Sequence, residues 1–372
     1  MSAIEPVKMP KWGLAMEEGK IVEWWAKEGD AVSEGDDLVD IETSKITNVC
    51  EAHAGGVLAR IVAQPEETLP VGALIAVLAE PDVADADVDA FIADYQANFD
   101  PGEASAEAAG PEIRSVEVYG RTMRVGVMGE GEAGTPVVLL HGFGGDLNNW
   151  MLVQPALAET RPVYAIELPG HGQSTKDVAD GKLGTLATGL VAAMEALGLE
   201  RFVLVGHSLG GALAVECASR LGDRVAALGL VCPAALPGGA VNGDYLDAFV
   251  AARRARDLRE PAKLLFADPE MVSRDMLEDL IRAKRLDGAE AALGAIKDGL
   301  KGDDPDYAGL GDKLGGLGCP VLVLASQSDQ IVGAPDAGAL PAGATLQWIE
   351  GAGHMPHLEK SGEVVTAIAR LG

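Results

Sequence analysis

A serine in a glycine-rich turn is the first group in this sequence that could do chemistry. The apolar run 203–205 is followed by Gly-His-Ser-Leu-Gly-Gly, with the serine at position 208, and then by a helix-forming stretch that reaches Arg220. A G-x-S-x-G turn between a strand and a helix presents the serine hydroxyl at the positive end of the helix, and its glycines permit the sharp turn. The pattern predicts that Ser208 is a nucleophile that attacks a carbonyl carbon.

Two polar residues that each follow an apolar run could activate this hydroxyl. Asp329 stands in S-Q-S-D-Q, and His354 stands in G-A-G-H-M-P-H-L-E. A histidine that accepts the serine proton, and an acid that fixes the tautomer of that histidine, are the usual partners of a nucleophilic serine. We therefore expect His354 to be the base and Asp329 to be the acid. His357 and Asp336 are the alternatives for these two roles.

An oxyanion-binding loop is predicted after an earlier apolar run. It reads His-Gly-Phe-Gly-Gly and begins at His141. The backbone N–H groups of Phe143 and Leu209 would hold the negative charge that develops on the attacked carbonyl oxygen. We interpret His141, His207 and Glu167 as structural or pocket-lining residues.

The elements that would position these residues are short buried strands that alternate with helical segments from residue 113 onward. This alternation is typical of an α/β domain with a parallel sheet. The expected strands are 137–140, 163–166, 202–205, 227–231, 321–325 and 346–349. Runs 116–119 and 122–128 predict an antiparallel hairpin at the sheet edge, giving about eight strands, and residues 236–313 predict a helical cap. With its Ser, Asp, His order, the stretch 113–372 resembles the α/β-hydrolase superfamily over its whole length.

Residues 1–80 show a different pattern, an internal repeat at an offset of 37 residues in which, for example, Gly19 matches Gly56. Short runs of apolar alternation between turn signals indicate an all-β unit, and the repeat indicates two similar halves packed face to face in a sandwich or barrel. Lys45 stands at the join of the two halves, within E-T-S-K-I-T. We expect this lysine at the tip of a hairpin.

The duplicated unit resembles the lipoyl domain of the acyltransferase components of 2-oxoacid and acetoin dehydrogenase complexes. The matching residues include M-P-K-W-G-L from Met9 and the E-G-D turn from Glu28. The resemblance implies that lipoate is attached covalently to Lys45, where it would carry an acyl group as a thioester. The common Asp-Lys-Ala triplet is Ser-Lys-Ile here. Biotin carriers usually place methionines on both sides of their lysine, so lipoylation is favoured over biotinylation.

Residues 81–112 contain nine acidic and no basic residues, which predicts an extended acidic linker. Val88, Phe91, Ile92 and Tyr95 recur within it at helical spacing. This spacing predicts that one short amphipathic helix interrupts the linker.

A lipoyl domain fused to a hydrolase-type domain resembles the dihydrolipoyllysine-residue acetyltransferase component of bacterial acetoin dehydrogenase systems. The resemblance implies an acyl carrier and acyltransferase that passes acetyl from the lipoyl lysine to coenzyme A. It also implies two partners, a thiamine-diphosphate-dependent acetoin-cleaving component and a dihydrolipoamide dehydrogenase. The H-x-x-x-D-G motif of ordinary 2-oxoacid dehydrogenase acyltransferases is missing, so Ser208 or direct transfer must move the acyl group. Two alternatives stay open: a serine carboxylic-ester hydrolase or thioesterase with a carrier domain, and a carrier or scaffold with a vestigial hydrolase domain.

The composition excludes other classes of function. The net charge of −28 repels phosphate backbones and anionic bilayers, so we expect neither a nucleic-acid nor a membrane partner. Four distant cysteines without a C-x-x-C pair predict no metal site and favour a reducing compartment, and no apolar run is long enough to cross a membrane. We therefore expect a cytoplasmic protein, and an oligomeric one.

One basic cluster stands out in this acidic chain and could bind the phosphates of coenzyme A through arginine. Its members are Arg253, Arg254, Arg256, Arg259 and Lys263. The alternative is a solvated helix face whose basic side chains pair with Asp257 and Glu260.

Overall fold

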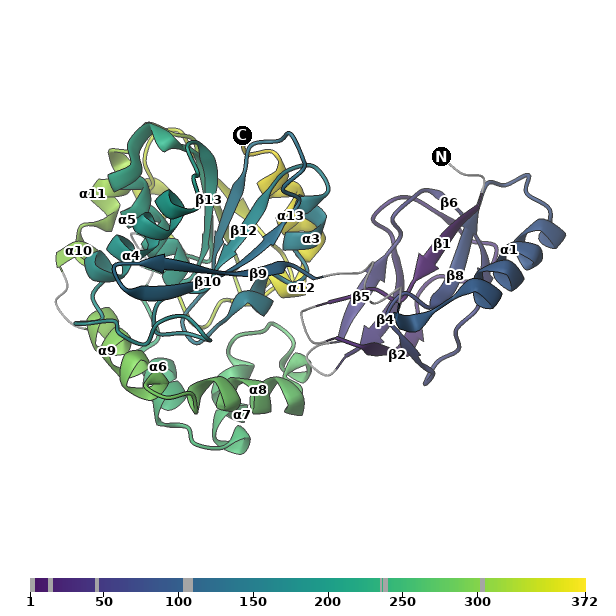
Figure 1. Ribbon diagram of the computed structural model, residues 1–372, viewed down its shortest axis with the longest axis horizontal. Coiled ribbons are helices and arrows are strands. Elements are labelled where there is room, and N and C mark those ends of the chain that lie inside the picture. Colours follow the sequence, from purple (N-terminus) through teal and green to yellow (C-terminus); the bar gives the residue numbers. More distant parts are fainter. Residues whose placement is uncertain are drawn as a thin grey trace. The chain divides into compact units, whose positions relative to one another are not determined.

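A computed structural model describes residues 4–12, 16–43, 47–102, 110–234, 236, 240–301 and 305–372. The chain forms two compact units, Met1–Gly110 and Pro111–Gly372 (Figure 1). Among the described residues, no helix is both long and apolar enough to cross a membrane.

The first unit is built from two four-stranded sheets. Its strands are β1 (Ile4–Lys8), β2 (Glu18–Trp24), β3 (Ala31–Val32), β4 (Asp37–Glu42), β5 (Thr47–Glu51), β6 (Gly56–Ile61), β7 (Thr68–Pro70) and β8 (Leu74–Ala79). One sheet has the order β1-β8-β6-β3 and the other β5-β4-β2-β7. Strand β8 begins 37 residues after β4, and the two strands belong to different sheets. The internal repeat predicted from the sequence is therefore confirmed as two similar halves.

The two halves differ on their outer faces. Leu38, Val39 and Ile41 of β4 face the shared core, as do the residues 37 positions later in β8. The outward residues of β4 are Asp37, Asp40 and Glu42, whereas the matching residues of β8 are Leu74, Val77 and Ala79. These apolar side chains form a second cluster, so the outer face of β8 needs a cover that β4 does not.

Helix α1 (Asp85–Asn98) supplies this cover. Val88 is buried, and Phe91 and Tyr95 pack against the second cluster. The Tyr95 hydroxyl donates a hydrogen bond to the Gly72 carbonyl oxygen over 2.8 Å. The helix expected inside an extended linker therefore docks on the β unit, and the boundary between the compact units falls later, at residue 110.

The second unit is built around an eight-stranded sheet. Its strands are β9 (Glu112–Val118), β10 (Arg121–Met128), β11 (Val137–Leu140), β12 (Val163–Ile166), β13 (Phe202–His207), β14 (Val225–Val231), β15 (Val321–Ala325) and β16 (Ala344–Trp348). The order is β16-β15-β14-β13-β11-β12-β10-β9. The six strands from β16 to β12 are parallel, and the β9–β10 hairpin is antiparallel at the edge, as the sequence predicted. Several strands are apolar along their whole length because helices cover both faces of a parallel sheet.

Helices cover this sheet and extend beyond one of its ends. Figure 1 shows α4 (Leu183–Ala196) and α5 (Leu209–Leu221) on one face, and α3 (Gln154–Ala158) and α13 (Ser361–Ala369) on the other. Further helices lie between β14 and β15: α6 (Gly243–Ala251), α7 (Ala255–Lys263), α8 (Arg274–Lys284), α9 (Ala289–Lys301), α10 (Pro305–Ala308) and α11 (Leu310–Gly315). The described part of region 236–313, where the sequence predicted the cap, is thus mainly helical, and its last two helices, α10 and α11, pack on α4 and α5.

Candidate functional site

A histidine and an aspartate from two neighbouring loops form a buried polar pair in the second unit. Nδ1 of His354 lies 2.8 Å from Oδ2 of Asp329, and both side chains are only 3% exposed. The other carboxylate oxygen accepts the backbone N–H groups of Ile331 and Val332 over 2.8 and 2.9 Å. Asp329 is therefore fixed at both oxygens, and it fixes the orientation of the His354 ring.

Ser208 occupies the turn between β13 and α5. Its backbone has φ 53° and ψ −118°, a strained conformation for a residue with a side chain. A Cβ added to Gly206 would overlap the Gly210 carbonyl, and one added to Gly210 would overlap the Leu140 carbonyl. The glycines around Ser208 are thus required by close backbone approach, which is the reason that the sequence pattern suggested.

The turn that carries Ser208 contacts the loop that carries His354. Nε2 of His207 donates a hydrogen bond to the His354 carbonyl oxygen over 2.8 Å, and the two imidazole centroids are 4.7 Å apart. Burial lowers the pKa of His207 well below its ordinary value, so this ring stays neutral. The sequence interpretation of His207 as a structural residue agrees with these contacts.

The predicted oxyanion loop lies against the same turn. A Cβ added to Gly142 would lie 3.1 Å from Cβ of Ser208. Leu209 is the first residue of α5, so its backbone N–H has no partner within the helix. His141 accepts the Leu168 N–H at Nε2 over 3.0 Å and contacts the Gly142 carbonyl through Nδ1 over 2.8 Å, which fixes the start of the loop.

The alternative base and acid are engaged elsewhere. His357 is fully buried between the rings of Trp150 and His207, and within the described residues neither of its nitrogens has a hydrogen-bond partner. Asp336 is exposed, and its carboxylate accepts the Gly338 N–H over 2.9 Å at a short helical turn. Neither residue takes part in the pair formed by His354 and Asp329.

Glu167 serves the fold of a loop. Its side chain is buried, and Oε2 accepts the backbone N–H groups of Gln173 and Ser174 over 2.6 and 2.9 Å. Burial raises the pKa of this carboxyl group. Glu167 thus holds the loop after β12, which agrees with its interpretation as structural.

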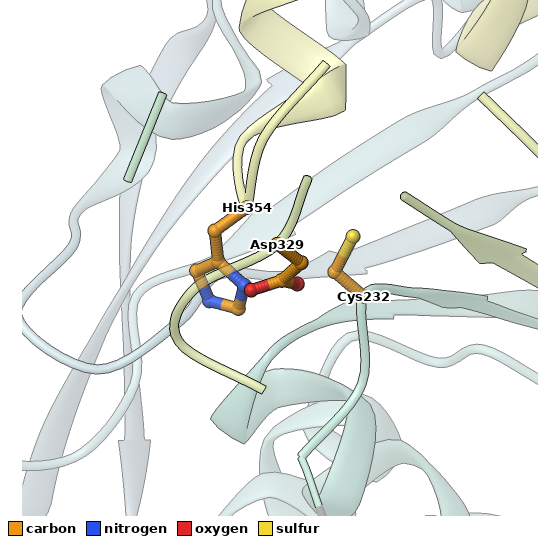
Figure 2. A group of neighbouring side chains, drawn as sticks. All are labelled: Cys232, Asp329 and His354. Atoms are coloured by element: carbon orange, nitrogen blue, oxygen red, sulfur yellow. The ribbon is translucent and has the colours of Figure 1, made fainter. Parts of the chain in front are cut away.

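Two residues near the pair were missed by the sequence reasoning. Cys232, directly after β14, lies beside Asp329, as Figure 2 shows. Burial, followed by the charge of Asp329, raises the pKa of its thiol well above the ordinary value. Glu359 accepts the backbone N–H groups of Gly353 and Ala267 over 2.8 and 2.7 Å, which links the His354 loop to the cap. The sequence signals these roles only by position: Cys232 comes one residue after an apolar strand, and Glu359 comes five residues after His354.

The candidate carrier lysine, Lys45, lies outside the described residues. The strands on either side of it are described: β4 and β5 are antiparallel, and Glu42 pairs with Thr47. Lys45 is therefore one of the four residues that connect a paired hairpin. Beside this connection the Lys20 amine pairs with the Glu42 carboxylate over 2.8 Å.

The basic cluster of the cap is mostly paired with carboxylates. Arg253 pairs with Glu290, and Lys263 pairs with Glu260 over 2.9 Å. Arg254 and Arg256 both contact Asp257, over 3.5 and 3.8 Å. These contacts favour the solvated helix face over a phosphate site.

Comparison with known proteins identifies both units and their combination. A family model described as an alpha/beta hydrolase fold matches residues 135–361, and one described as a biotin-requiring enzyme, of the biotin and lipoyl type, matches residues 5–78. A Pseudomonas putida protein described as the dihydrolipoyllysine-residue acetyltransferase component of an acetoin cleaving system is 43% identical over 98% of this chain and 97% of its own. The chain belongs to this acetyltransferase family. A member from Cupriavidus necator is 41% identical over 97% of this chain and 95% of its own.

Solved structures agree with the fold of the acetyltransferase's second unit. A serine hydrolase from Cycloclasticus zankles, 19% identical, has a TM-score of 0.63 and covers 70% of this chain and 97% of its own. A 2-hydroxy-6-oxo-6-phenylhexa-2,4-dienoate hydrolase from Rhodococcus, 23% identical, has a TM-score of 0.62 and covers 69% of this chain and 98% of its own. The predicted family and fold classes are thus confirmed.

Proposed function

We propose that this chain is the acyl carrier and acyltransferase of an acetoin-cleaving system, which takes an acetyl group onto a lipoyl group at Lys45 and passes it to coenzyme A. The observation that carries the proposal is family membership over the full length of both units. The buried His354–Asp329 pair beside the Ser208 turn supports Ser208 as the group through which the acyl group passes.

The residues of the second unit would perform the first half of the transfer. Because Nδ1 of His354 is committed to Asp329, Nε2 is the nitrogen left to accept the Ser208 proton. The serine oxygen attacks the thioester carbonyl, and the C–S bond breaks as the leaving sulfur takes the proton back from Nε2. The acyl group is then an ester on Ser208.

The second half reverses these steps with a new thiol. The coenzyme A sulfur attacks the ester while Nε2 of His354 accepts the thiol proton, and Ser208 leaves with that proton. In both halves the backbone N–H groups of Phe143 and Leu209 would hold the oxyanion. Water in place of the thiol would give free acetate, which is the outcome that distinguishes a hydrolase or thioesterase.

The position of Lys45 fits a lipoyl attachment site. The four-residue connection between β4 and β5 follows from the pairing of Glu42 with Thr47, and the Glu42 side chain beside it is about half exposed. When bound there, lipoate would supply a disulfide that accepts an acyl group as a thioester. We assign residues 1–80 to the carrier, residues 81–112, whose helix α1 docks on the carrier, to the connection, and residues 113–372 to the acyltransferase unit.

The partners would be a thiamine-diphosphate-dependent component that cleaves acetoin and a dihydrolipoamide dehydrogenase, because the relatives are described as components of such a system. We place the complex in the cytoplasm. The four free cysteines of the chain, two of them buried, are compatible with that reducing compartment.

The test measures acetyl-coenzyme A formed from acetyl-dihydrolipoamide by the full chain. Ser208→Ala should lower the rate by about 10³-fold or more, because only binding and the oxyanion loop remain. Ser219→Ala, in an exposed part of the same helix α5, is the matched control and should keep the parental rate. An unchanged rate in Ser208→Ala would leave direct transfer or the scaffold alternative.

A further inference from the structure

The N-terminal end of helix α6 in the cap is hydrogen-bonded to the loop that carries Asp329. The N-cap residue, Asn242, donates its backbone N–H to the Ile331 carbonyl over 2.7 Å and its Nδ2 to the Gln330 carbonyl over 3.0 Å. Ile331 is also one of the residues whose N–H groups hold Oδ1 of Asp329. The start of α6 is therefore fixed relative to the acid that orients His354.

The other end of α6 packs on the oxyanion loop. The Phe249 ring is 5.6 Å from the Phe143 ring, centroid to centroid, and is buried. Gly144 has φ +76°, and an added Cβ there would overlap the Phe249 ring. Gly142 of the same loop lies against Ser208, so the contacts of this loop with Ser208 and with Phe249 are only two residues apart.

A buried lysine fixes this second end. Nζ of Lys284, from α8, donates hydrogen bonds to the carbonyls of Phe249, Val250 and Ala252, the last over 2.6 Å. Lys284 is buried, and these backbone carbonyls accept its hydrogen bonds. Burial lowers its pKa to about 8. The carbonyl end of a helix attracts a cation, so the lysine offsets its burial only while these carbonyls keep their positions.

We propose that Phe249 limits the length of the acyl group accepted at Ser208, and that Lys284 is the positioning residue that holds Phe249 against the oxyanion loop. The inference rests on the proposed function of Ser208. An acyl group on Ser208 whose oxygen is held by the Phe143 N–H would lie along this loop. A short chain would then stop before the Phe249 ring, whereas a longer chain would have to displace it. One extra methylene changes kcat/KM by about 10- to 200-fold in a hydrophobic pocket.

The test compares kcat/KM for p-nitrophenyl acetate and p-nitrophenyl hexanoate in the full chain. Phe249→Ala should raise the hexanoate-to-acetate ratio by about tenfold or more. Leu246→Ala, which removes a buried side chain from the same helix, is the matched control and should leave the ratio near that of the parent. The ratio is measured within one preparation, so a smaller folded fraction does not change it.

Lys284→Met tests the positioning role with the same two esters. We expect the ratio to rise in the same direction by a smaller factor, about threefold. Lys297→Met is its control, because Lys297 pairs over 3.1 Å with Asp247, which lies in the middle of α6 and not at its end. In Phe249→Ala/Lys284→Met the second change should add little, since both act through one ring.

The outcomes separate this inference from the proposed function. Turnover of the acetate ester that Ser208→Ala removes would establish Ser208 as the nucleophile, whichever acceptor takes the acyl group, and an unchanged ratio in Phe249→Ala then overturns the role of Phe249 alone. A parental ratio in Lys284→Met overturns the positioning role. If neither ester is turned over in a Ser208-dependent way, this inference fails, and the acetyl-coenzyme A assay of the proposed function decides separately whether the acyl group passes through Ser208.

Discussion

The two units hold their candidate reactive residues in opposite ways. In the first unit, Lys45 belongs to the connection of a hairpin whose neighbouring side chains, Lys20 and Glu42, are 34% and 48% exposed. In the second unit, Ser208 is buried and the His354 and Asp329 side chains are 3% exposed. A carrier must reach the sites of other proteins, whereas a nucleophile needs an environment in which tautomer and charge are fixed. The difference indicates two separable chemical roles in one chain.

The largest expected effect is the separation of these roles by two substitutions. Lys45→Arg should abolish lipoylation in a lipoate-competent host, because arginine offers no amine for the amide bond, and should leave Ser208-dependent ester hydrolysis unchanged. Peptide mass spectrometry and an ester assay on the same preparation measure both properties. Lys20→Arg is the control lysine on the neighbouring strand. A biotin adduct, or an unmodified Lys45 in the parent, would contradict the carrier role.

The buried pair of the second unit predicts the next effect. Asp329→Asn should lower turnover of a short ester by about 10³–10⁴-fold, because the amide stabilises the wrong tautomer of His354. Asp336→Asn is the matched control, since Asp336 is exposed and holds only a local turn. Equal losses in both variants, measured as kcat/KM, would mean that the acid has been misassigned.

Helix α1 predicts an effect confined to the first unit. Val88→Asp places a carboxylate without a partner against the apolar outer face of β8 and should lower the free energy of unfolding of this unit by about 3 kcal/mol. Asp87→Ala, one residue away and exposed, should stay within about 0.5 kcal/mol. Denaturant unfolding followed by separate probes in the two units measures the shift. A parental midpoint in Val88→Asp would show that α1 does not stabilise the β unit.

Acid should destabilise the second unit before the first, because buried neutral imidazoles lie there. Burial lowers the pKa of His357 from its ordinary value of 6.5 to about 3. The unfolded chain therefore binds this proton first, and stability is lost as the pH falls below 6.5. At pH 5 the loss from this group is about 2 kcal/mol. His357→Phe replaces the imidazole by a ring without titratable nitrogens. In this variant the free energy of unfolding should depend less on pH between pH 6.5 and pH 5. An equally steep pH profile in this variant would assign the acid sensitivity to other groups.

The strands and the His354–Asp329 pair could be predicted because their signals are local in sequence. The predicted runs 137–140, 163–166 and 321–325 coincide with β11, β12 and β15, since each is a continuous apolar segment. Ser208, Asp329 and His354 each follow an apolar strand, so the edge of the sheet where they meet follows from the parallel topology. The last strand, β16, begins at Ala344, two residues earlier than expected.

Contacts between distant segments could not be predicted. The sequence showed the apolar face of α1 but not that Leu74 and Val77 of β8 are what it covers. The sequence does not distinguish Lys284 from a solvated helix lysine, because its hydrogen bond to the end of α6 depends on the packing of two helices. The position of Cys232 beside Asp329 could not be predicted either, because Asp329 lies on another loop. In each case the partner depends on packing between helices or loops that local patterns do not encode.

The acyl group's route through Ser208 to coenzyme A is the central claim, and trapping the acyl-enzyme tests it most directly. The full chain is mixed with acetyl-dihydrolipoamide, quenched, and measured by intact and peptide mass spectrometry, with and without coenzyme A. We predict one acetyl group on the Ser208 peptide, absent in Ser208→Ala, that coenzyme A removes with the formation of an equal amount of acetyl-coenzyme A. An adduct released only as acetate, or acetyl-coenzyme A formed at the parental rate without Ser208, would contradict the account.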